Sequence, residues 1–467
     1  MEIISQIVYL ISSIFFILGI KKLGSPKTAR LGNQYAAIGM LLAIVVTLFD
    51  HQIVSFTYII VGLVIGSGLG ALMATRVQMT GMPQMVGLLN GFGGGASTLV
   101  AVSEYYLILT TPTLSFELST SITIILSVLI GSVTFTGSFI AFGKLQGIVT
   151  GAVVKYPGQH PLNLLLLLGV IGGGAYVVYD PSSTMVLLGV VAISLLLGIL
   201  LVLPIGGADM PVAVSLLNSY SGLAASATGF VLNNNVLIIA GALVGASGFI
   251  LTMIMCRGMN RSLMNVLLGG WDTAGSAVAT SGGTKDAGPQ KPVKSVDAEE
   301  AAMIFDSASS VIIVPGYGMA VAQAQHAIRD LTNVLEKKGI KVRFAIHPVA
   351  GRMPGHMNVL LAEANISYDK LYALEDINDD FSNTDVAFII GANDVVNPAA
   401  RHDQSSPIYG MPILNVDYAK TVIMNKRSMS AGYAGISNEL FFYDNTMMYF
   451  GDAKDAVSKL VNEIKAL

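Results

Sequence analysis

Long apolar stretches follow one another through the first half of the chain, and short polar segments separate them. A helix that crosses the hydrocarbon core of a bilayer needs roughly 17–25 mainly apolar residues. By this rule the pattern predicts about nine membrane spans, and the second is shorter than the others. The predicted spans are Ile3–Ile20, Tyr35–Phe49, Val54–Ala74, Met82–Ala101, Ser119–Phe142, Leu162–Tyr179, Met185–Leu203, Met210–Val231 and Val236–Met255.

The pattern changes in the second half, where short apolar runs alternate with runs of helical periodicity. Such alternation predicts a Rossmann-like α/β domain with a doubly wound parallel sheet, whose ligands bind beyond the carboxyl ends of the strands. A helix is expected to start after Ser295. The other predicted helices are Met319–Lys338, Met357–Glu363 and Ala453–Ala466, and the predicted strands are Val311–Val314, Val342–Ile346, Val386–Ile390, Ile413–Val416, Val422–Met424 and Met447–Phe450.

Between the two halves, residues 272–296 are rich in Gly, Ser, Thr, Lys and Pro, which is typical of a flexible linker. We therefore divide the chain into a transmembrane domain (1–261), a linker (262–296) and an α/β domain (297–467).

Composition supports a membrane protein, because 53% of the 467 residues are hydrophobic and only 12% are charged. A net charge of −3 gives no indication of a nucleic-acid partner. The single cysteine, Cys256, excludes an internal disulfide and a cysteine metal cluster, and we assign no metal ligands.

Charges in the first half predict the topology through the positive-inside rule. With nine spans, all basic residues fall on one side and five acidic residues fall on the other. The amino terminus is then outside and the α/β domain is cytoplasmic. The basic residues are Lys21, Lys22, Lys27, Arg30, Arg76, Lys144, Lys155, Arg257 and Arg261, and the acidic residues are Glu2, Asp50, Glu104, Glu117 and Asp180.

One further acidic residue, Asp209, is predicted at the inner end of the eighth span. Asp followed by Met210 and Pro211 is a normal helix start, with the carboxylate as a cap. Asp209 is also a candidate titratable group at the mouth of a proton path. These two interpretations are compatible.

The fourth and eighth spans begin with related segments, Met82–Asn90 (MPQMVGLLN) and Met210–Asn218 (MPVAVSLLN). A parallel duplication of this kind often places a transport site between the two copies. Each copy carries a polar stripe at helical spacing, and for its serines and glycines we favour close helix packing. The stripes are Gln84, Gly87, Asn90, Gly94 and Ser97 in one span and Ser215, Asn218, Ser219, Gly222 and Ser226 in the other.

Asn90 and Asn218 are candidate functional residues, because each is an amide predicted well inside an apolar helix. No Lys, Arg, His, Asp or Glu lies near the centre of a predicted span. A proton relay usually needs a titratable group or a water chain. If protons cross, a partner chain is expected to supply the titrating residue.

In the α/β domain, the first predicted strand ends in Pro315, followed by Gly316-Tyr317-Gly318 and a helix-forming run. A strand, a glycine turn and a helix start can present backbone N–H groups to a phosphate. An ordinary strand-to-helix turn accounts for the pattern equally well.

Three further loops follow predicted strands. The segment after His347 has the glycines and proline of a mobile lid, and its Arg352 could bind phosphate. The third strand is followed by Gly391–Asp394. Lys426-Arg427-Ser428 suits the 2′-phosphate that distinguishes NADP from NAD, although a solvated basic loop is the alternative.

The chain resembles the β subunits of bacterial proton-translocating NAD(P) transhydrogenases over both halves. The resemblance implies hydride transfer between NADH and NADP⁺, coupled to proton movement across the bacterial inner membrane. This chain would bind NADP(H). An α subunit of one or two chains would bind NAD(H) and supply membrane helices, in a dimer of such assemblies. The stretches that carry the resemblance are Gly206–Pro211, Leu217–Gly222, Pro315–Gln325, the Arg352 loop, Gly391–Asp394 and Lys426–Met429.

By position, the resemblance implies an NADP(H) site built from five loops, and it implies that Asp394 lies near the nicotinamide. The resemblance also implies that Asp209 lies at the inner mouth of the proton channel, and Asn90 and Asn218 remain candidates from the residue pattern. Some relatives carry a histidine at the position of Asn90. The implied cofactor-binding residues are Gly316, Tyr317, Gly318, Met319, Ala320, Val321, Val349, Ala350, Gly351, Arg352, Met353, Pro354, Gly355, Gly391, Ala392, Asn393, Asp394, Lys426, Arg427, Ser428, Met429, Gly432, Tyr433, Gly451, Asp452 and Ala453.

Two other functional classes fit the same pattern. A transporter or channel gated by a nucleotide-sensing domain would need no second dinucleotide-binding chain. A membrane anchor with a binding-only domain would leave Asn90, Asn218 and Asp209 without a role.

Overall fold

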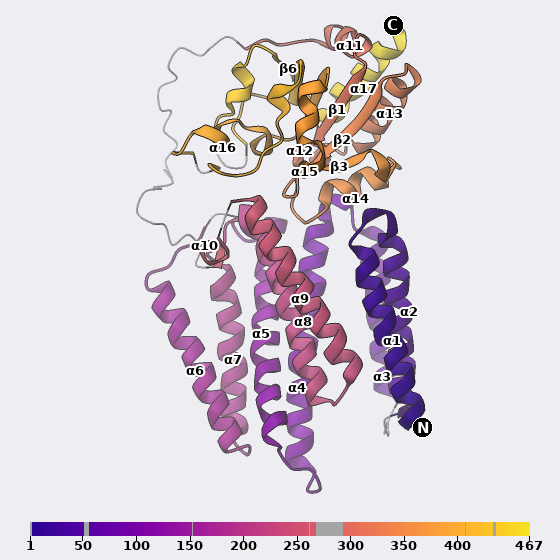
Figure 1. Cartoon of the computed structure of the whole chain (residues 1–467). Coiled ribbons are helices and arrows are strands. Elements are labelled where there is room, and N and C mark those ends of the chain that lie inside the picture. Colours follow the sequence, from indigo (N-terminus) through magenta and orange to yellow (C-terminus); the bar gives the residue numbers. More distant parts are fainter. Residues whose placement is uncertain are drawn as a thin grey trace. The chain divides into compact units, whose positions relative to one another are not determined.

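A computed structural model describes residues 2–50, 56–151, 153–260, 262–267, 293–406, 408–432 and 436–467. Most of the predicted linker, residues 268–292, lies outside the described residues. The chain divides into two compact units, one formed by the amino-terminal helices and the other containing all of the α/β fold (Figure 1).

The first unit consists of long helices, and each predicted span overlaps one of them. Within the described residues, eight are long and apolar enough to cross a membrane. The helix that falls short is α8, whose serines, threonine and asparagine lower its hydropathy. The helices are α1 (Glu2–Leu23), α2 (Pro26–Asp50), α3 (Phe56–Arg76), α4 (Met82–Thr110), α5 (Leu118–Gln146), α6 (Gln159–Tyr179), α7 (Thr184–Val202), α8 (Met210–Val231) and α9 (Asn235–Gly258), followed by the short α10 (Leu263–Leu267).

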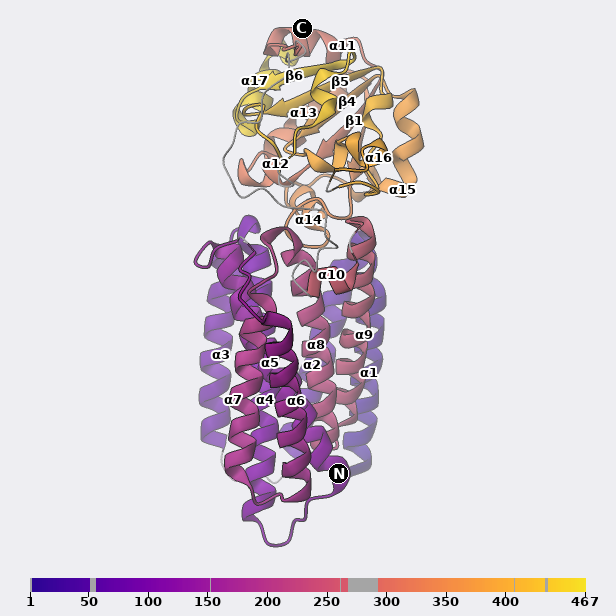
Figure 2. The ribbon, with the colours of Figure 1, turned by 90° about the vertical axis from the view of Figure 1, so that its left-hand side faces the viewer.

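Helix α5 packs against α4, α7 and α8, and most residues of α8 are buried (Figure 2). The glycines of α8 and α9 allow their backbones to meet, since a Cβ on Gly222 would overlap the backbone of Gly245. Ser215 and Ser219 donate hydrogen bonds to carbonyls of α9, at 3.3 Å and 2.6 Å. The packing role predicted for these serines and glycines is confirmed.

The sequence repeat has a structural counterpart at the start of α4 and α8. A 3₁₀ turn precedes each helix, Met79–Gly81 in one case and Gly207–Asp209 in the other. The N-cap residues, Gly81 and Asp209, have nearly the same backbone angles, φ −91° and ψ 0° against φ −89° and ψ 0°. The two copies therefore begin with the same local fold, and only one carries a carboxylate there.

The second unit is built on a six-stranded, fully parallel sheet with the order β3-β2-β1-β4-β5-β6, as the fold prediction requires. Figure 2 shows β1, β4, β5 and β6 of this sheet. Its central strands are almost completely buried. The strands are β1 (Ser310–Pro315), β2 (Lys341–Ile346), β3 (Leu371–Ala373), β4 (Val386–Ile390), β5 (Thr421–Lys426) and β6 (Thr446–Phe450).

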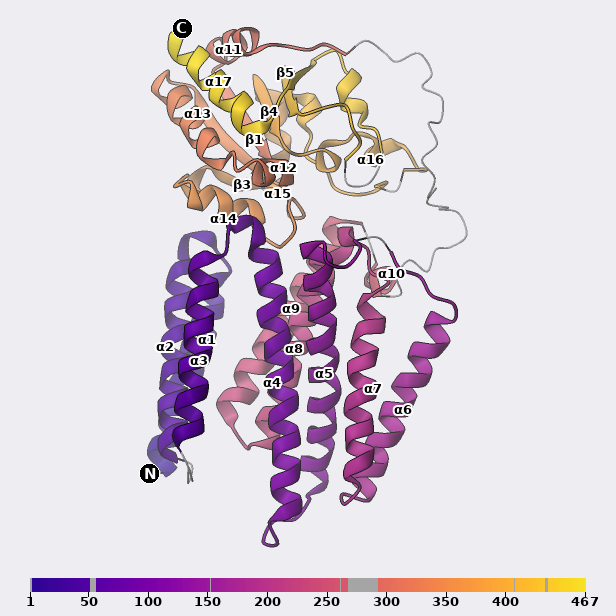
Figure 3. The same cartoon turned by 180° about the vertical axis from the view of Figure 1, so that it is seen from behind.

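Helices α11 and α13 both pack against α17 on one face of the sheet (Figure 3). Asp297 caps α11 in a capping box with Glu300, as expected of a helix that starts after Ser295. The helices of this unit are α11 (Ala298–Asp306), α12 (Tyr317–Val321), α13 (Gln325–Lys337), α14 (His356–Glu363), α15 (Leu374–Ile377), α16 (Ala399–His402) and α17 (Ala453–Ala466).

Two predicted elements are wrong. Ile413–Val416 is not a strand. Leu414 and Val416 are buried in the hydrophobic core, but the segment forms no ladder with a neighbouring strand, so its apolar residues reflect burial and not sheet pairing. The edge strand is β3 instead, which has no β-branched residue to mark it. The predicted helix Met319–Lys338 is broken after α12 by a turn in which Gln323 has φ +51°.

Candidate functional site

The strand order of the sheet reverses between β1 and β4, which lie side by side in the register Pro315↔Ile390. Chain segments leave these two strands toward opposite edges of the sheet. Open α/β sheets bind their ligands at such a switch point, beyond the carboxyl ends of the strands. Gly316 and Gly391 are the first residues beyond the two ends.

The glycines at the switch point hold the two loops together. The N–H of Gly316 donates to Ile390 O at 2.8 Å, and the N–H of Gly318 donates to Gly391 O at 2.9 Å. A Cβ on Gly318 would lie 2.7 Å from Gly391 Cα, and one on Gly391 (φ +68°) would overlap Met319 N. Close packing of the chain on itself therefore explains these glycines, and the Gly318 N–H is engaged within the protein.

The rest of α12 divides between packing and surface. Met319 and Ala320 are buried, so their side chains support the fold. Tyr317 is half-buried and Val321 is exposed, which leaves these two side chains at the edge of the sheet.

The predicted lid, residues 349–355, connects β2 to α14 and turns at Gly351 (φ +109°) and Gly355 (φ +68°). Its Arg352 guanidinium lies over the Tyr317 ring, 4.4 Å from the centroid, which is a favourable cation–π geometry. This contact ties the lid to α12. Among the other predicted lid residues, Ala350 is buried, and Val349, Met353 and Pro354 are half-buried.

A buried histidine supports the lid from below. The backbone N–H of Arg352 donates to His356 Nδ1 at 3.1 Å, and His356 is fully buried. Burial lowers the pKa of His356, and the neighbouring Arg352 charge lowers it further. The imidazole is therefore held neutral, so that Nδ1 can accept the lid hydrogen bond.

A second buried histidine fixes the start of the same segment. His347 Nε2 bonds to Pro412 O at 2.7 Å, and the Val349 N–H donates to His347 Nδ1 at 3.2 Å. Burial lowers the pKa of His347 to about 4, although the bond to Pro412 and the Glu375 charge act in the opposite direction.

Lys426, the last residue of β5, joins two of the predicted loops. Its Nζ donates to Asn393 Oδ1 at 2.8 Å and to Ser430 O at 2.8 Å, and it lies 4.6 Å from the Phe441 ring centroid. Burial lowers the pKa of Lys426, and the Asp394 carboxylate opposes that shift. Asn393 Nδ2 in turn donates to Asp394 Oδ1 at 2.9 Å.

The predicted basic trio does not act as one group in the structure. Lys426 is half-buried and bonded within the fold, whereas Arg427, Ser428 and Met429 are exposed. Gly432 packs against the Asn393–Asp394 pair so closely that a Cβ would overlap both side chains. Tyr433, another predicted site residue, lies outside the described residues.

The loop after β6 meets the same edge. The Gly451 N–H donates to Lys426 O at 3.0 Å, and Asp452 caps α17 by accepting from the Lys454 N–H at 3.1 Å. Ala453 is buried. Together with the Arg352–Tyr317, Gly318–Gly391 and Lys426–Asn393 contacts, this bond joins all five predicted loops in one continuous line along the sheet edge.

In the helical unit, Asp209 is half-buried at the N-cap of α8, and its side chain does not accept the capping hydrogen bond. The predicted role of the Asp209 carboxylate as a helix cap is therefore wrong. Asn90 is buried, and its Nδ2 donates to Ser138 Oγ of α5 at 2.9 Å. Asn218 is half-buried on α8, which packs against α4.

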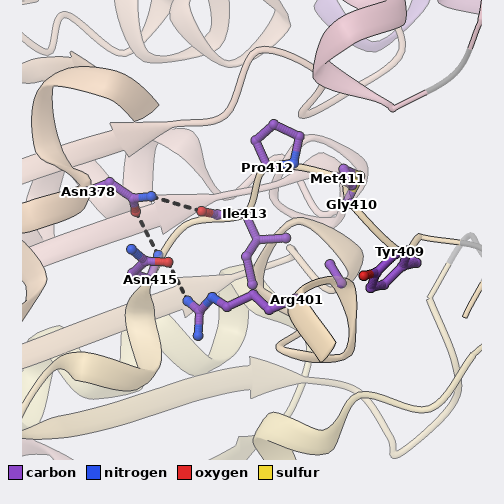
Figure 4. Close-up of a pocket in the computed structure, with 9 residues that line it drawn as sticks. Asn378, Arg401, Tyr409, Gly410, Met411, Pro412, Ile413 and Asn415 are labelled. Atoms are coloured by element: carbon purple, nitrogen blue, oxygen red, sulfur yellow. Dashed lines mark hydrogen bonds between the residues drawn. The ribbon is translucent and has the colours of Figure 1, made fainter. Parts of the chain in front are cut away.

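A cavity of about 480 Å³ lies elsewhere in the α/β unit (Figure 4). Asn378 shapes its wall by donating to Ile413 O at 3.0 Å and accepting from the Asn415 N–H at 2.7 Å. No predicted site residue lines it, so we do not place the dinucleotide there. Its lining residues are Asn378, Ala400, Arg401, Tyr409, Gly410, Met411, Pro412, Ile413 and Asn415.

Residues 5–463 match the family described as NAD(P) transhydrogenase beta subunit. The chain belongs to this family. Two relatives named NAD(P) transhydrogenase subunit beta, both from Rhodospirillum rubrum and one assigned to a specific strain, are each 50% identical over 458 residues. That alignment covers 97% of this chain and 97% of each relative. The family resemblance inferred from the sequence is confirmed, and the chain is a multi-pass membrane protein.

Several residues that support the site in this transhydrogenase β subunit were missed by sequence reasoning. Asn438 donates to Asn393 O at 2.9 Å, and Phe441 lies beside Lys426. Ser138 holds Asn90. No local pattern marks Asn438 or Phe441, because their partners are distant in sequence. His356 directly follows the lid, and a search for polar residues at its hinge could have found it.

Proposed function

We propose that this chain is the NADP(H)-binding, membrane-spanning subunit of a proton-translocating NAD(P) transhydrogenase. Together with an α subunit that binds NAD(H), it transfers hydride between NADH and NADP⁺ and couples the transfer to proton movement. The observation that carries the proposal is the contact line along the sheet edge, where five predicted loops meet in a chain that also spans the membrane.

The residues at this edge fit NADP(H). Arg427 and Ser428 are exposed beside the end of β5, where a guanidinium and a hydroxyl can bind a 2′-phosphate. Lys426 uses two of its three donors on Asn393 and Ser430, so its main part is to shape this loop. When bound, NADP(H) supplies the hydride chemistry.

The chain's own residues orient the cofactor and exclude water. Arg352 and Tyr317 close the lid side of the site. Asp394, held by Asn393, places a carboxylate at the switch point, where we assign it to the nicotinamide end. The other exposed and half-buried residues of the five loops form the walls, and the buried ones, such as Met319 and Ala320, support these loops from the core.

The membrane unit is proposed to carry the protons. Asp209 is the titratable group at the inner end, and the amides of Asn90 and Asn218 bind water along α4 and α8. A titrating residue near the centre of the path comes from the α subunit. Proton occupancy at Asp209 biases the lid between open and closed states, and a decisive shift of such an equilibrium needs about 5 kcal/mol, which one proton crossing about 200 mV can supply.

We place the protein in the bacterial inner membrane with its amino terminus outside, on the positive-inside argument. Residues 1–261 then form the proton-translocating domain, 262–296 the linker and 297–467 the cytoplasmic domain. The partner is an α subunit of one or two chains, and two such assemblies form the complete enzyme.

The test is the reduction of a thio-NADP⁺ analogue by NADH in vesicles, with the internal pH followed at the same time. Hydride transfer that requires the α subunit and moves protons supports the proposal. Solute or proton flux without the α subunit, and without hydride transfer, would instead favour a nucleotide-gated channel.

A further inference from the structure

Lys144 is a buried cation near the end of α5, outside the proton path proposed above. The residue is only 5% exposed. Its Nζ donates to Leu203 O at 2.5 Å and to Ile205 O at 2.8 Å. Removing an ammonium group from water is costly unless its donors are satisfied, so these bonds constrain the segment that accepts them.

That segment is the connection from α7 to α8. Carbonyls just beyond a helix end carry the negative end of the helix dipole, and a lysine there is favourable. A methionine could fill a similar volume but could not donate a hydrogen bond. The position therefore uses the amine of Lys144 and not only its aliphatic stem.

The connection ends at Asp209. The Gly207 N–H donates to Gly151 O at 2.8 Å, and the Asp209 N–H donates to Gly206 O at 3.0 Å within the 3₁₀ turn. Ile205 is four residues before Asp209, and each residue spans at most about 3.5 Å. The bond from Lys144 to Ile205 O thus limits where the carboxylate can lie.

Helix α5 also carries Ser138, the partner of Asn90. Ser138 and Lys144 are six residues apart, which corresponds to about 9 Å along the helix axis. One rigid helix therefore carries both the Asn90 contact and the anchor of the Asp209 segment.

We propose that Lys144 is a positioning residue for Asp209. By binding the carbonyls of Leu203 and Ile205, it fixes the α7–α8 connection to α5 and holds the carboxylate in register with the Asn90–Ser138 pair. This inference rests on the proposed role of Asp209 in proton coupling. Lys144 itself neither binds substrate nor transfers the proton.

The test uses the complete α–β enzyme in sealed vesicles, and it measures protons moved per hydride together with the hydride-transfer rate in the presence of an uncoupler. Lys144→Met removes charge-assisted hydrogen bonds that hold the α7–α8 connection, so it should lower the proton-to-hydride ratio well below that of wild type. Lys144→Arg should restore most of the ratio, because a guanidinium can donate to the same carbonyls. The matched control is Lys155→Met, which removes an exposed lysine from the connection between α5 and α6 and should behave as wild type.

Asp209→Asn, measured beside these variants, separates the two hypotheses. If Asp209→Asn leaves coupling normal, the proposed role of Asp209 fails. If it abolishes coupling while Lys144→Met couples normally, the Lys144 inference alone is overturned.

Lys144→Gln provides the test if the methionine variant does not assemble. It keeps one neutral donor and should give an intermediate loss, so a wild-type ratio would overturn the inference.

Discussion

The buried imidazole of His347 should make the stability of the α/β unit depend on pH. The residue is 2% exposed, and burial lowers its pKa to about 4. Its ordinary pKa in an unfolded chain is about 6.5. The unfolded state therefore binds the proton more readily, so the stability is complete above about pH 6.5 and is lost as the pH falls toward 4.

The size of the effect follows from the two pKa values. Proton linkage gives a loss of about 2 kcal/mol in the free energy of unfolding between about pH 7.5 and about pH 5. Below about pH 4 the loss approaches about 3 kcal/mol. Protonation at Nδ1 would also remove the acceptor for the Val349 N–H, so the lid segment should loosen first.

The assay is urea unfolding of the whole chain in detergent, with pulse proteolysis reporting cleavage within residues 293–467. His347→Gln can keep a donor for Pro412 O and cannot titrate, so its stability should fall by about 2 kcal/mol less than that of wild type over the same pH range. His326→Gln changes an exposed histidine of α13 and is the control. Equal losses in wild type and His347→Gln would refute the reasoning.

Three further predictions concern the switch point, the phosphate site and coupling. Gly391→Ala should lower the free energy of unfolding of the α/β unit by about 3 kcal/mol or more, because the added Cβ would overlap Met319 N and Gly391 has φ +68°. The control is Gly339→Ala, since Gly339 has φ +83° but open space around it. It should cost only about 1 kcal/mol in the same urea assay. Arg427→Ala should weaken NADP(H) binding about 10- to 100-fold by calorimetry and leave NAD(H) binding to the complete enzyme unchanged, so equal losses for both dinucleotides would contradict the assignment. Asp209→Asn should stop or uncouple turnover with NADP(H) still bound, and normal coupled turnover in proteoliposomes would exclude its role.

The wrong strand prediction at Ile413–Val416 shows a limit of local sequence patterns. Ile413–Val416 reads as a strand because apolar and β-branched residues follow one another. Their burial is real, but Leu414 fills the core without pairing to a neighbouring strand. The same limit applies to the break after α12, since neither a glycine nor a proline marks Gln323 as a turn.

The site loops could be predicted because parallel strands bring their carboxyl ends to one edge. The contacts that each residue makes within the protein could not be predicted in this way. Gly316 and Gly318 are predicted to let the backbone approach a phosphate, and the structure adds that Gly318 and Gly391 allow two loops of the chain to touch. Lys426 is predicted to bind a phosphate, and the structure adds that its Nζ joins Asn393 to Ser430.

The sequence by itself determined the long apolar helices seen in the described residues, the parallel α/β unit and the family, and it predicted the loops of the candidate site. These depend on local hydrophobic periodicity and on short motifs, which a linear chain carries directly. Only the tertiary structure decided that His356 supports the lid, that Asn438 holds Asn393 and that Lys144 anchors the segment of Asp209. Each of these contacts joins a side chain to a backbone group, and the partners of Asn438 and Lys144 are distant in sequence, so the residue pattern does not mark them.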